Sequence, residues 1–418
     1  MSEVVVVKQV GYKTLFKEKE YMKYLIAKFI SRFGDSIDTV AYGWMVFQLT
    51  GSVVLLATLY AVNGIPSFLF NIVSGVVVGY LPKKRVVFLC DIGRGIIVFI
   101  TALLYMNSML MPWHLFVFTF INSTFEAFRS PADTSLLTKI ISRDKYEYAV
   151  SFDSSGTTLV ELLGYSIAGI LISLINVGGV IVVDSITFLL CGIIIATLRM
   201  DKETLNIGKL TVKQYFVDLK EGIKYVTSKK LILSVCLFAG LFNMLLVPFN
   251  SMQAAYVKLV LEKGPGTISL MAVSFLVAMT IGGILVPLLK KKFTGFQMFI
   301  TAGIVIGISY LTFSQLGRIN ESFLVYGLVA LASVLMGVAV PILMVPIKVS
   351  LMSNIEQEFI PRAISFVNAL ALSSVPLGGA IVGLLCGFLS LQTIFLLFSI
   401  AVILLFITQI FNKSLRRL

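Results

Sequence analysis

The segment SGVVVGYLPKKR, residues 74–85, closes an apolar run with a short basic loop. About half a chain later, GGILVPLLKKKF, residues 282–293, repeats its order of glycine, apolar residues, a proline and three basic residues. A second pair, residues 151–172 and 365–386, begins with Ser-Phe and continues to Leu-Gly, with another glycine five residues on. Because both matches occur in the same order, the two halves of the chain are predicted to be parallel repeats.

The chain is too apolar for a water-soluble protein. It has 418 residues, of which 58% are hydrophobic and 13% are charged. Runs of about 20 apolar residues, each able to cross a hydrocarbon core of roughly 30 Å, recur along it. The sequence therefore predicts an all-α membrane protein with twelve transmembrane helices in two pseudo-symmetric six-helix bundles. The predicted spans are 22–49, 53–80, 86–106, 113–140, 147–174, 178–199, 231–259, 267–289, 295–316, 322–352, 360–386 and 389–411.

The basic residues mark one side of the membrane. They concentrate in alternate loops, which is the positive-inside pattern of cytoplasmic loops. We therefore expect cytoplasmic segments at 1–21, 200–230 and 412–418, and bundles at 22–199 and 231–411. Within the connector, YFVDLKEGIKYV has the apolar spacing of an amphipathic helix on the membrane surface. Candidate gate residues on this side are Gly75, Lys83, Lys84, Arg85, Asp91, Arg94, Lys290, Lys291 and Lys292.

The first span, KFISRFGDSIDTVAYGWMVFQLTGS at residues 28–52, contains charges that are costly in a bilayer. Each charge costs roughly 2.5–3.5 kcal/mol at the centre of a membrane helix. Arg32, Asp35, Asp38 and Tyr42 follow one another at steps of three or four, so they share one helix face. Such a face must line a bundle interior or a wet cavity.

Further spans carry polar residues at similar depths. Asn122, Glu126 and Arg129 share a face of the fourth span, and Glu161 lies midway along the fifth. We expect Asp35, Glu126 and Glu161 to meet near the centre of the first half. The second half offers uncharged or basic residues to line the same cavity: Asn243, Asn250, Gln253 and Lys348.

A carboxyl group in a cavity of low dielectric favours its neutral form, which allows proton exchange near neutral pH. We therefore assign proton coupling and recognition of substrate charge to Asp35, Glu126 and Glu161, with Asp38 in a secondary role. The alternative is structural. Arg32 with Asp35, and Glu126 with Arg129, have the i,i+3 spacing of permanent ion pairs.

Several motifs resemble the macrolide-efflux-type branch of drug:proton antiporters in the major facilitator superfamily. They occur in the expected order along the whole chain. They are FGDSIDTVAYGWMVFQLTGS at 33–52, FRSPADTSLLTKIISRDKY at 128–146, VDSITFLL at 183–190, DLKEGIKYV at 218–226 and IEQEFIPRAISF at 355–366. The resemblance implies the major facilitator fold, export of drug-like compounds, and a cavity lined by spans one, four, five, seven, eight, ten and eleven.

The loop after the second span departs from the superfamily pattern Gly-x-x-x-Asp-Arg-x-Gly-Arg-Arg. Gly75 is kept, but Gly79 replaces the aspartate, Tyr80 the arginine and Pro82 the later glycine. In the superfamily that aspartate helps to latch the cytoplasmic gate. The antiporter Gly-Pro motif of the fifth span is also absent, since LLGYSIAG contains no proline.

These observations predict a secondary transporter. The sequence contains no nucleotide-binding loop, metal cluster or nucleophile constellation, so neither an enzyme nor a cofactor is expected. We predict a monomer in the bacterial cell membrane that binds a small amphipathic substrate and protons but no nucleic acid, and exports by alternating access. Two alternatives remain: a dedicated exporter of an endogenous siderophore, peptide or lipid, and a non-transporting sensor or scaffold with the same fold.

Overall fold

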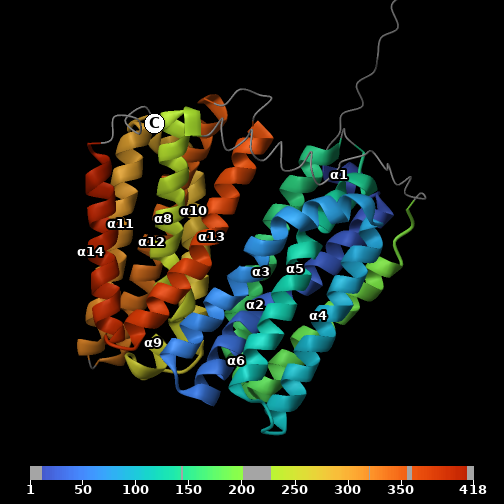
Figure 1. The fold of residues 1–418 in the computed structure, drawn as a ribbon, viewed down its shortest axis with the longest axis horizontal. Helices are drawn as coiled ribbons and strands as arrows, with labels where there is room; N and C mark the ends of the chain where they lie inside the picture. The colour runs from blue at the N-terminus through green and yellow to red at the C-terminus, as the bar shows by residue number, and fades with distance from the viewer. Residues whose placement is uncertain (1–11, 143–144, 201–226, 320, 355–359, 412–418) are drawn as a thin grey trace, which may run out of the picture.

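The computed structural model describes residues 12–142, 145–200, 227–319, 321–354 and 360–411, and the secondary structure of this part is helical throughout (Figure 1). The helices are α1 (Tyr12–Leu15), α2 (Lys19–Thr50), α3 (Val53–Tyr80), α4 (Lys83–Met106), α5 (Pro112–Ile140), α6 (Tyr146–Ala196), α8 (Lys230–Ser251), α9 (Gln253–Leu259), α10 (Gly266–Leu289), α11 (Gly295–Gln315), α12 (Ser322–Asn354), α13 (Ile360–Cys386) and α14 (Leu391–Gln409), with a 3₁₀ turn at Leu316–Arg318.

The described long helices make twelve crossings of the molecule, as predicted, because α6 crosses twice. Asn176 has φ 61° and ψ 171° inside α6 and reverses the chain there. On either side of it, Gly164 and Asp184 both lie against α2 near Gly34 and Ser36, so the two legs are antiparallel. Eight helices of the described part are long and apolar enough to cross a membrane by length and composition alone. The charged helices α2 and α5 are not among them.

The predicted span 231–259 is wrong in one respect, because it forms two helices. α8 ends at Ser251, and α9 starts at Gln253 after Met252 leaves the helical conformation at φ −108° and ψ 3°. Pro248 lies in the last turn of α8 and has no N–H to donate, which weakens the helix just before this break. The predicted connector helix lies outside the described residues.

The Thr-Gly-Ser motif at 50–52 explains the turn between α2 and α3. Gly51 has φ 60°, a left-handed conformation that glycine adopts without strain, and its N–H donates to the Phe47 carbonyl. Ser52 then caps α3, because its hydroxyl accepts a hydrogen bond from the N–H of Leu55. The motif thus ends one crossing and starts the next within two residues.

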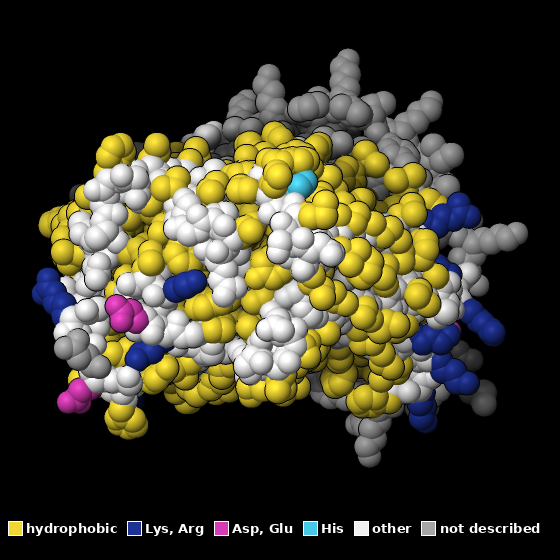
Figure 2. Space-filling model, turned by 90° about the horizontal axis from the view of Figure 1, so that it is seen from below, with side chains coloured by type: hydrophobic (Ala, Val, Ile, Leu, Met, Phe, Trp, Pro, Cys, Tyr) yellow, Lys and Arg dark blue, Asp and Glu magenta, His cyan; other side chains and the backbone are white. Residues whose placement is uncertain are grey.

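The helices form two groups that lie side by side (Figure 1). α2 to α6 make one half, and α8 to α14 make the other. The groups converge at the end that holds α9 and diverge toward the end where α2 begins, which we name the outer end and the inner end. Viewed from the outer end, the surface is mostly apolar or neutral over its centre, and the charged side chains gather toward its left and right sides (Figure 2).

The interiors of the two halves differ. All six of the buried charged side chains among the described residues belong to the first half. The second half instead packs aromatic rings, and the ring centroids of Phe238, Phe299 and Phe406 lie 4.8–5.3 Å apart in tilted or edge-on arrangements. Ionic chemistry is thus placed in the first half, and the second half is held by apolar packing.

Small residues bring the two halves into contact at the outer end. A Cβ on Gly379 of α13 would lie 2.7 Å from the Ala61 Cβ of α3. Gly169 of α6 comes equally close to Gly266 of α10, since a Cβ there would lie 2.7 Å from the Gly266 Cα. Lys258 of α9 adds a cation–π contact, with its Nζ 5.7 Å from the Trp44 ring centroid.

We predict that Gly379→Val separates the halves at the outer end. The added methyl groups overlap Ala61, at a cost of about 1–3 kcal/mol for overpacking. A bimane fluorophore on Lys258→Cys is expected to be quenched by Trp44 in the parent protein and to brighten in the valine variant. Gly283→Val is the control, because nothing lies within 4 Å of its Cβ position. Equal brightness in both variants would contradict this contact.

Candidate functional site

One buried arginine joins three helices of the first half. Arg94 of α4 donates from Nη2 to Asp35 Oδ1 of α2 at 3.0 Å and from Nη1 to Glu126 Oε2 of α5 at 2.6 Å. Its Nε donates to Asn122 Oδ1 at 3.0 Å, and the Phe188 ring of α6 lies 4.1 Å from the guanidinium carbon. We name Arg94, Asp35, Asn122 and Glu126 the Arg94 cluster. It brings Asp35 and Glu126 together, as the sequence predicted.

The two carboxylates of this cluster are partly exposed. The side chain of Arg94 is 8% exposed, whereas those of Asp35 and Glu126 are 24% and 34% exposed. Both carboxylates are therefore more accessible than the cation that they bind. An Arg guanidinium stays protonated in proteins, so any exchange of protons in the cluster falls to the carboxyl groups.

A second ion pair in the same half is dry. Arg129 of α5 donates from Nε to Asp91 Oδ1 of α4, and the two side chains are 4% and 0% exposed. The Cys191 thiol of α6 donates to the other Asp91 oxygen at 3.2 Å. Charges buried this deeply must remain paired, because removing either partner leaves an uncompensated ion. This arrangement indicates a structural role for Asp91 and Arg129.

The pairing of Glu126 with Arg129, considered from their i,i+3 spacing, is wrong. α4 and α5 exchange partners instead, so that Arg94 binds Glu126 and Arg129 binds Asp91. The chain order Asp-x-x-Arg in α4 meets Glu-x-x-Arg in the antiparallel α5, which places opposite charges across the interface. The local pair of Arg32 with Asp35 does form, at a longer 3.5 Å.

The polar face of α2 meets a different neighbour at each level. Near the inner end, Lys28 Nζ lies 2.7 Å from Asp153 Oδ2 of α6 and 3.3 Å from Asp133 Oδ2 of α5. Toward the outer end, the Tyr42 hydroxyl hydrogen-bonds the Thr119 hydroxyl of α5 at 2.7 Å. The Arg94 cluster lies between these levels, on Asp35. The predicted polar face is therefore turned into the bundle.

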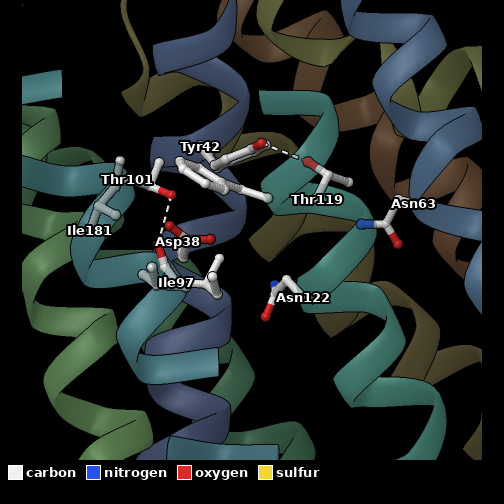
Figure 3. A pocket seen from close by; sticks show the side chains of 10 residues that line it. Asp38, Tyr42, Asn63, Ile97, Thr101, Thr119, Asn122 and Ile181 are labelled. Atoms are coloured by element: carbon white, nitrogen blue, oxygen red, sulfur yellow. Dashed lines mark hydrogen bonds between the residues drawn. The ribbon is translucent and has the colours of Figure 1, made fainter. Parts of the chain in front are cut away.

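Asp38 faces a small cavity inside the first half (Figure 3). The cavity measures about 90 Å³, enough for several water molecules. In Figure 3 Asp38 lies below Tyr42, with Thr101 on one side and Asn122 on the other. Its Oδ1 is buried and has no hydrogen-bond partner among the described residues. Because Asn122 belongs to both the cavity and the Arg94 cluster, the two are continuous.

Glu161 of α6 does not contact the Arg94 cluster, but it interacts electrostatically with Asp35, which belongs to the cluster. It makes no hydrogen bond or ion pair within the described part of the chain, and its main electrostatic partners are Arg32 and Asp35 of α2. Asp35 at the middle of α2 therefore shares Arg94 with Glu126 and interacts with Glu161, which is left unpaired among the described residues.

The predicted residues of the second half make simpler contacts. Asn243 donates to the carbonyl of Ala239 in its own helix at 2.8 Å. Asn250 is exposed and lies beside Tyr60 of α3, across the boundary between the halves. Gln253 begins α9 and is partly exposed. The side chain of Lys348 lies outside the described residues.

The predicted gate residues share the inner end, and their gating role stays a prediction. Lys84 Nζ donates to the Leu198 carbonyl at 2.7 Å and so ties α4 to the end of α6. Arg85 and Lys290 to Lys292 lie at the surface, Lys83 is partly exposed at the start of α4, and the surroundings of Gly75 are outside the description. Asp91 and Arg94 lie deeper, inside the bundle.

Sequence reasoning missed the central position of Arg94 and the small polar residues around Asp38. It grouped Arg94 with Asp91 because of their spacing, and it gave no weight to Asn63, Thr101 or Thr119, which line the cavity. One signal was available in the sequence. Arg94 follows Asp91 by three residues in one span, and Arg129 follows Glu126 by three residues in the next. Which helices adjoin one another is not encoded in that spacing.

A family model described as Transmembrane secretion effector matches residues 14–417. The chain belongs to this family of major facilitator transporters. It is therefore a secondary transporter that binds a small molecule in a membrane, and not an enzyme, as predicted. It is also a multi-pass membrane protein, and its matched curated relatives are bacterial.

Two curated relatives illustrate the range of the family. Macrolide efflux protein A of Streptococcus pyogenes is 23% identical over 356 residues, which are 84% of this chain and 85% of that protein. The uncharacterized MFS-type transporter YkuC of Bacillus subtilis is 24% identical over 229 residues. That match spans about half of each chain, 53% in both cases.

Solved structures confirm the predicted fold. A mutant of the nucleoside transporter NupG matches with a TM-score of 0.77 at 14% identity, over 94% of this chain and 99% of that one. A bacterial homologue of the iron transporter ferroportin, in an inward-facing state, matches with a TM-score of 0.72 at 13% identity, over 93% and 98%.

We predict that Arg129→Met destabilises the protein by about 3–5 kcal/mol, because Asp91 is left as an unpaired buried charge. The double variant Asp91→Leu/Arg129→Met is expected to regain most of that loss, since apolar side chains can fill the space of a dry pair. Lys23→Ala, which removes an exposed i,i+3 pair with Glu20, should cost less than about 1 kcal/mol.

Thermal unfolding of the purified variants in detergent measures these differences. A double variant as unstable as Arg129→Met alone would show that the pair is needed for more than its own charge balance.

Proposed function

We propose that the protein is a proton-coupled exporter of a small amphipathic compound and works by alternating access of its two halves. Asp35, Glu126 and Glu161 exchange protons and receive the charge of the substrate, and Asp38 assists them. The observation that carries this proposal is the sharing of one buried guanidinium by two partly exposed carboxylates, Asp35 and Glu126.

A shared cation makes the two carboxylates interdependent. Arg94 has one positive charge and faces two carboxylates, and Arg32 contributes a second, weaker contact to Asp35. Protonation of one carboxyl group lets the guanidinium turn fully to the other, since a charged hydrogen bond is worth more than a neutral one. A cationic group of the substrate supplies the same compensation as a proton. Proton and substrate then compete for the same carboxylates.

The cavity at Asp38 gives protons a route into this cluster. At about 90 Å³ it admits water but is too small for a drug-sized molecule, whose pockets measure about 300–1,000 Å³. Water in it can contact Asp38 and, through Asn122, the ligands of Arg94. We infer that the small cavity serves protons and that the substrate binds between the halves.

We propose that the inner end faces the cytoplasm. The short loops with Lys83 to Arg85 and Lys290 to Lys292 lie at this end, and the positive-inside rule places such loops in the cytoplasm. The halves touch at the outer end, through Gly379 and Lys258 among others. The structure then corresponds to a state that receives substrate from the cytoplasmic side.

The similarity to macrolide efflux protein A favours a drug-like substrate. Export of an endogenous siderophore, peptide or lipid remains the alternative, and it predicts unchanged drug susceptibility when the gene is deleted. A non-transporting sensor predicts no flux of any compound in proteoliposomes. The sensor alternative is supported by the sequence at the end of α3, in which Gly79 stands where the superfamily pattern has an aspartate.

We predict that Asp35→Asn and Glu161→Gln each reduce pH-driven efflux by at least about tenfold, because each removes a carboxyl group to which we assign proton exchange. Both changes keep the size of the side chain and remove its proton exchange. Efflux is measured with macrolides and with ethidium in inside-out vesicles under an imposed pH gradient. Full efflux by both variants would remove the assignment.

Two controls separate coupling from folding. Asp35→Glu keeps a titratable group beside Arg94 and should retain more activity than Asp35→Asn. Glu262→Gln changes an exposed carboxylate near the outer end and should leave efflux unchanged. The amount of folded protein in the membrane is compared for every variant.

We predict opposite labelling of the two ends. A cysteine in place of Lys291, exposed at the inner end, should react with a membrane-impermeant maleimide only in inside-out vesicles. A cysteine in place of Asn107, exposed at the outer end, should react only in right-side-out cells. The reverse pattern would overturn the orientation.

A further inference from the structure

A groove separates α6 from α10 in the inner part of the molecule. It measures about 440 Å³ and is lined by Ser154, Ser155, Thr158, Leu159 and Leu162 of α6 and by Val277, Thr280 and Ile281 of α10. This volume lies within the range of small-molecule sites, about 300–1,000 Å³. It is several times larger than the cavity at Asp38.

The lining is apolar in effect although half of its side chains carry hydroxyl groups. The Thr158 hydroxyl donates to the Ser154 carbonyl at 3.1 Å, and the Thr280 hydroxyl donates to the Leu276 carbonyl at 3.0 Å. Each of these hydrogen bonds is made to the backbone of the same helix, α6 for Thr158 and α10 for Thr280. A ligand therefore meets methyl and methylene groups at these positions rather than free donors.

The groove is closed toward the outer end. At that end the N–H of Gly169 donates to the Ser269 hydroxyl at 3.1 Å, and the backbones of α6 and α10 touch. Thr158 lies about 16 Å farther inward along α6, at 1.5 Å per residue. Between these points the two helices separate, so the groove lies within the membrane-spanning part of both.

The order of side chains around α6 shows what the groove connects. At about 100° per residue, Leu159 is turned about 100° from Thr158 toward the outside, where it is exposed, as is Leu163 one turn on. Glu161 is turned about 60° from Thr158 the other way, toward Arg32 and Asp35 of α2. One edge of the groove thus meets the lipid, and the other meets a carboxylate that is unpaired among the described residues.

We propose that this groove binds the hydrocarbon part of a cationic amphipathic substrate that enters from the inner leaflet, with its cation at Glu161. The inference rests on the proposed function and specifies the substrate class and the route. The carboxylate supplies charge complementarity at one edge. The apolar lining is expected to tighten binding about fourfold for each methylene buried, which a polar cation without a chain cannot gain.

The test uses the purified full-length protein in phosphatidylcholine nanodiscs. The probe is a dodecyl quaternary ammonium with a diazirine at the end of its chain, and cross-linked peptides are mapped by mass spectrometry. We expect labelling within residues 154–162 and 277–281, and displacement by dodecyltrimethylammonium but not by tetramethylammonium.

Variants locate the site. Leu159→Trp and Ile281→Trp fill the groove and should reduce labelling by about tenfold, as expected when roughly two methylene groups lose their burial. Leu163→Trp is the matched control, because Leu163 is as exposed as Leu159 (61% against 62%) but does not line the groove. Labelling equally sensitive to all three variants would overturn the proposal.

Other outcomes are equally decisive. A phosphatidylcholine probe that labels the groove and is not displaced by the amphipath would assign the groove to membrane lipid and overturn the proposal. Glu161→Gln should reduce labelling of the groove by the cationic probe but not by an uncharged dodecyl analogue. Full pH-driven efflux by Asp35→Asn and Glu161→Gln would overturn the proposed coupling but leave groove labelling intact, so the two proposals fail separately.

Discussion

The first half is organised around the need to compensate one buried positive charge. Arg94 cannot lose its proton, and a cation at 7% exposure is stable only with carboxylates and a ring face around it. Asp35 and Glu126 supply the charge, Asn122 accepts a further bond, and Phe188 covers the guanidinium. These partners come from α2, α5 and α6, so a single side chain fixes the relative positions of four helices.

The two ion pairs between α4 and α5, Asp91–Arg129 and Arg94–Glu126, differ in how deeply they are buried. Asp91 and Arg129 are sealed from solvent, and changing the charge of either is costly. Asp35 and Glu126 remain partly exposed beside Arg94, with side chains that are 24% and 34% exposed. The first pair holds the helices together, and the second is the one that the proposed coupling employs. The second half, packed with phenylalanine rings, contributes apolar surface and the contacts at Gly379 and Lys258.

Much of this arrangement could be predicted from the sequence. Hydrophobic runs gave the crossings, and the spacing of Asp35, Asp38 and Tyr42 placed them on one inward face. The partners could not be predicted, because spacing along one helix reports only local neighbours. The exchange of partners between Asp91–Arg94 and Glu126–Arg129 depends on α4 lying against α5. The break at Met252 was hidden inside an apolar run, where Pro248 alone did not fix its position.

The two cavities divide the proposed chemistry by size and polarity. The space at Asp38 is lined by carboxyl, amide and hydroxyl groups, whereas the groove between α6 and α10 is about five times larger and effectively apolar. Glu161 lies on the face of α6 next to the groove and interacts with Asp35, which touches Arg94, so a charge bound there would act on a group to which we assign proton exchange. A substrate without a cation would bury its chain but leave Glu161 and Asp35 unchanged. The coupling proposed here therefore requires that the exported compound carry both parts.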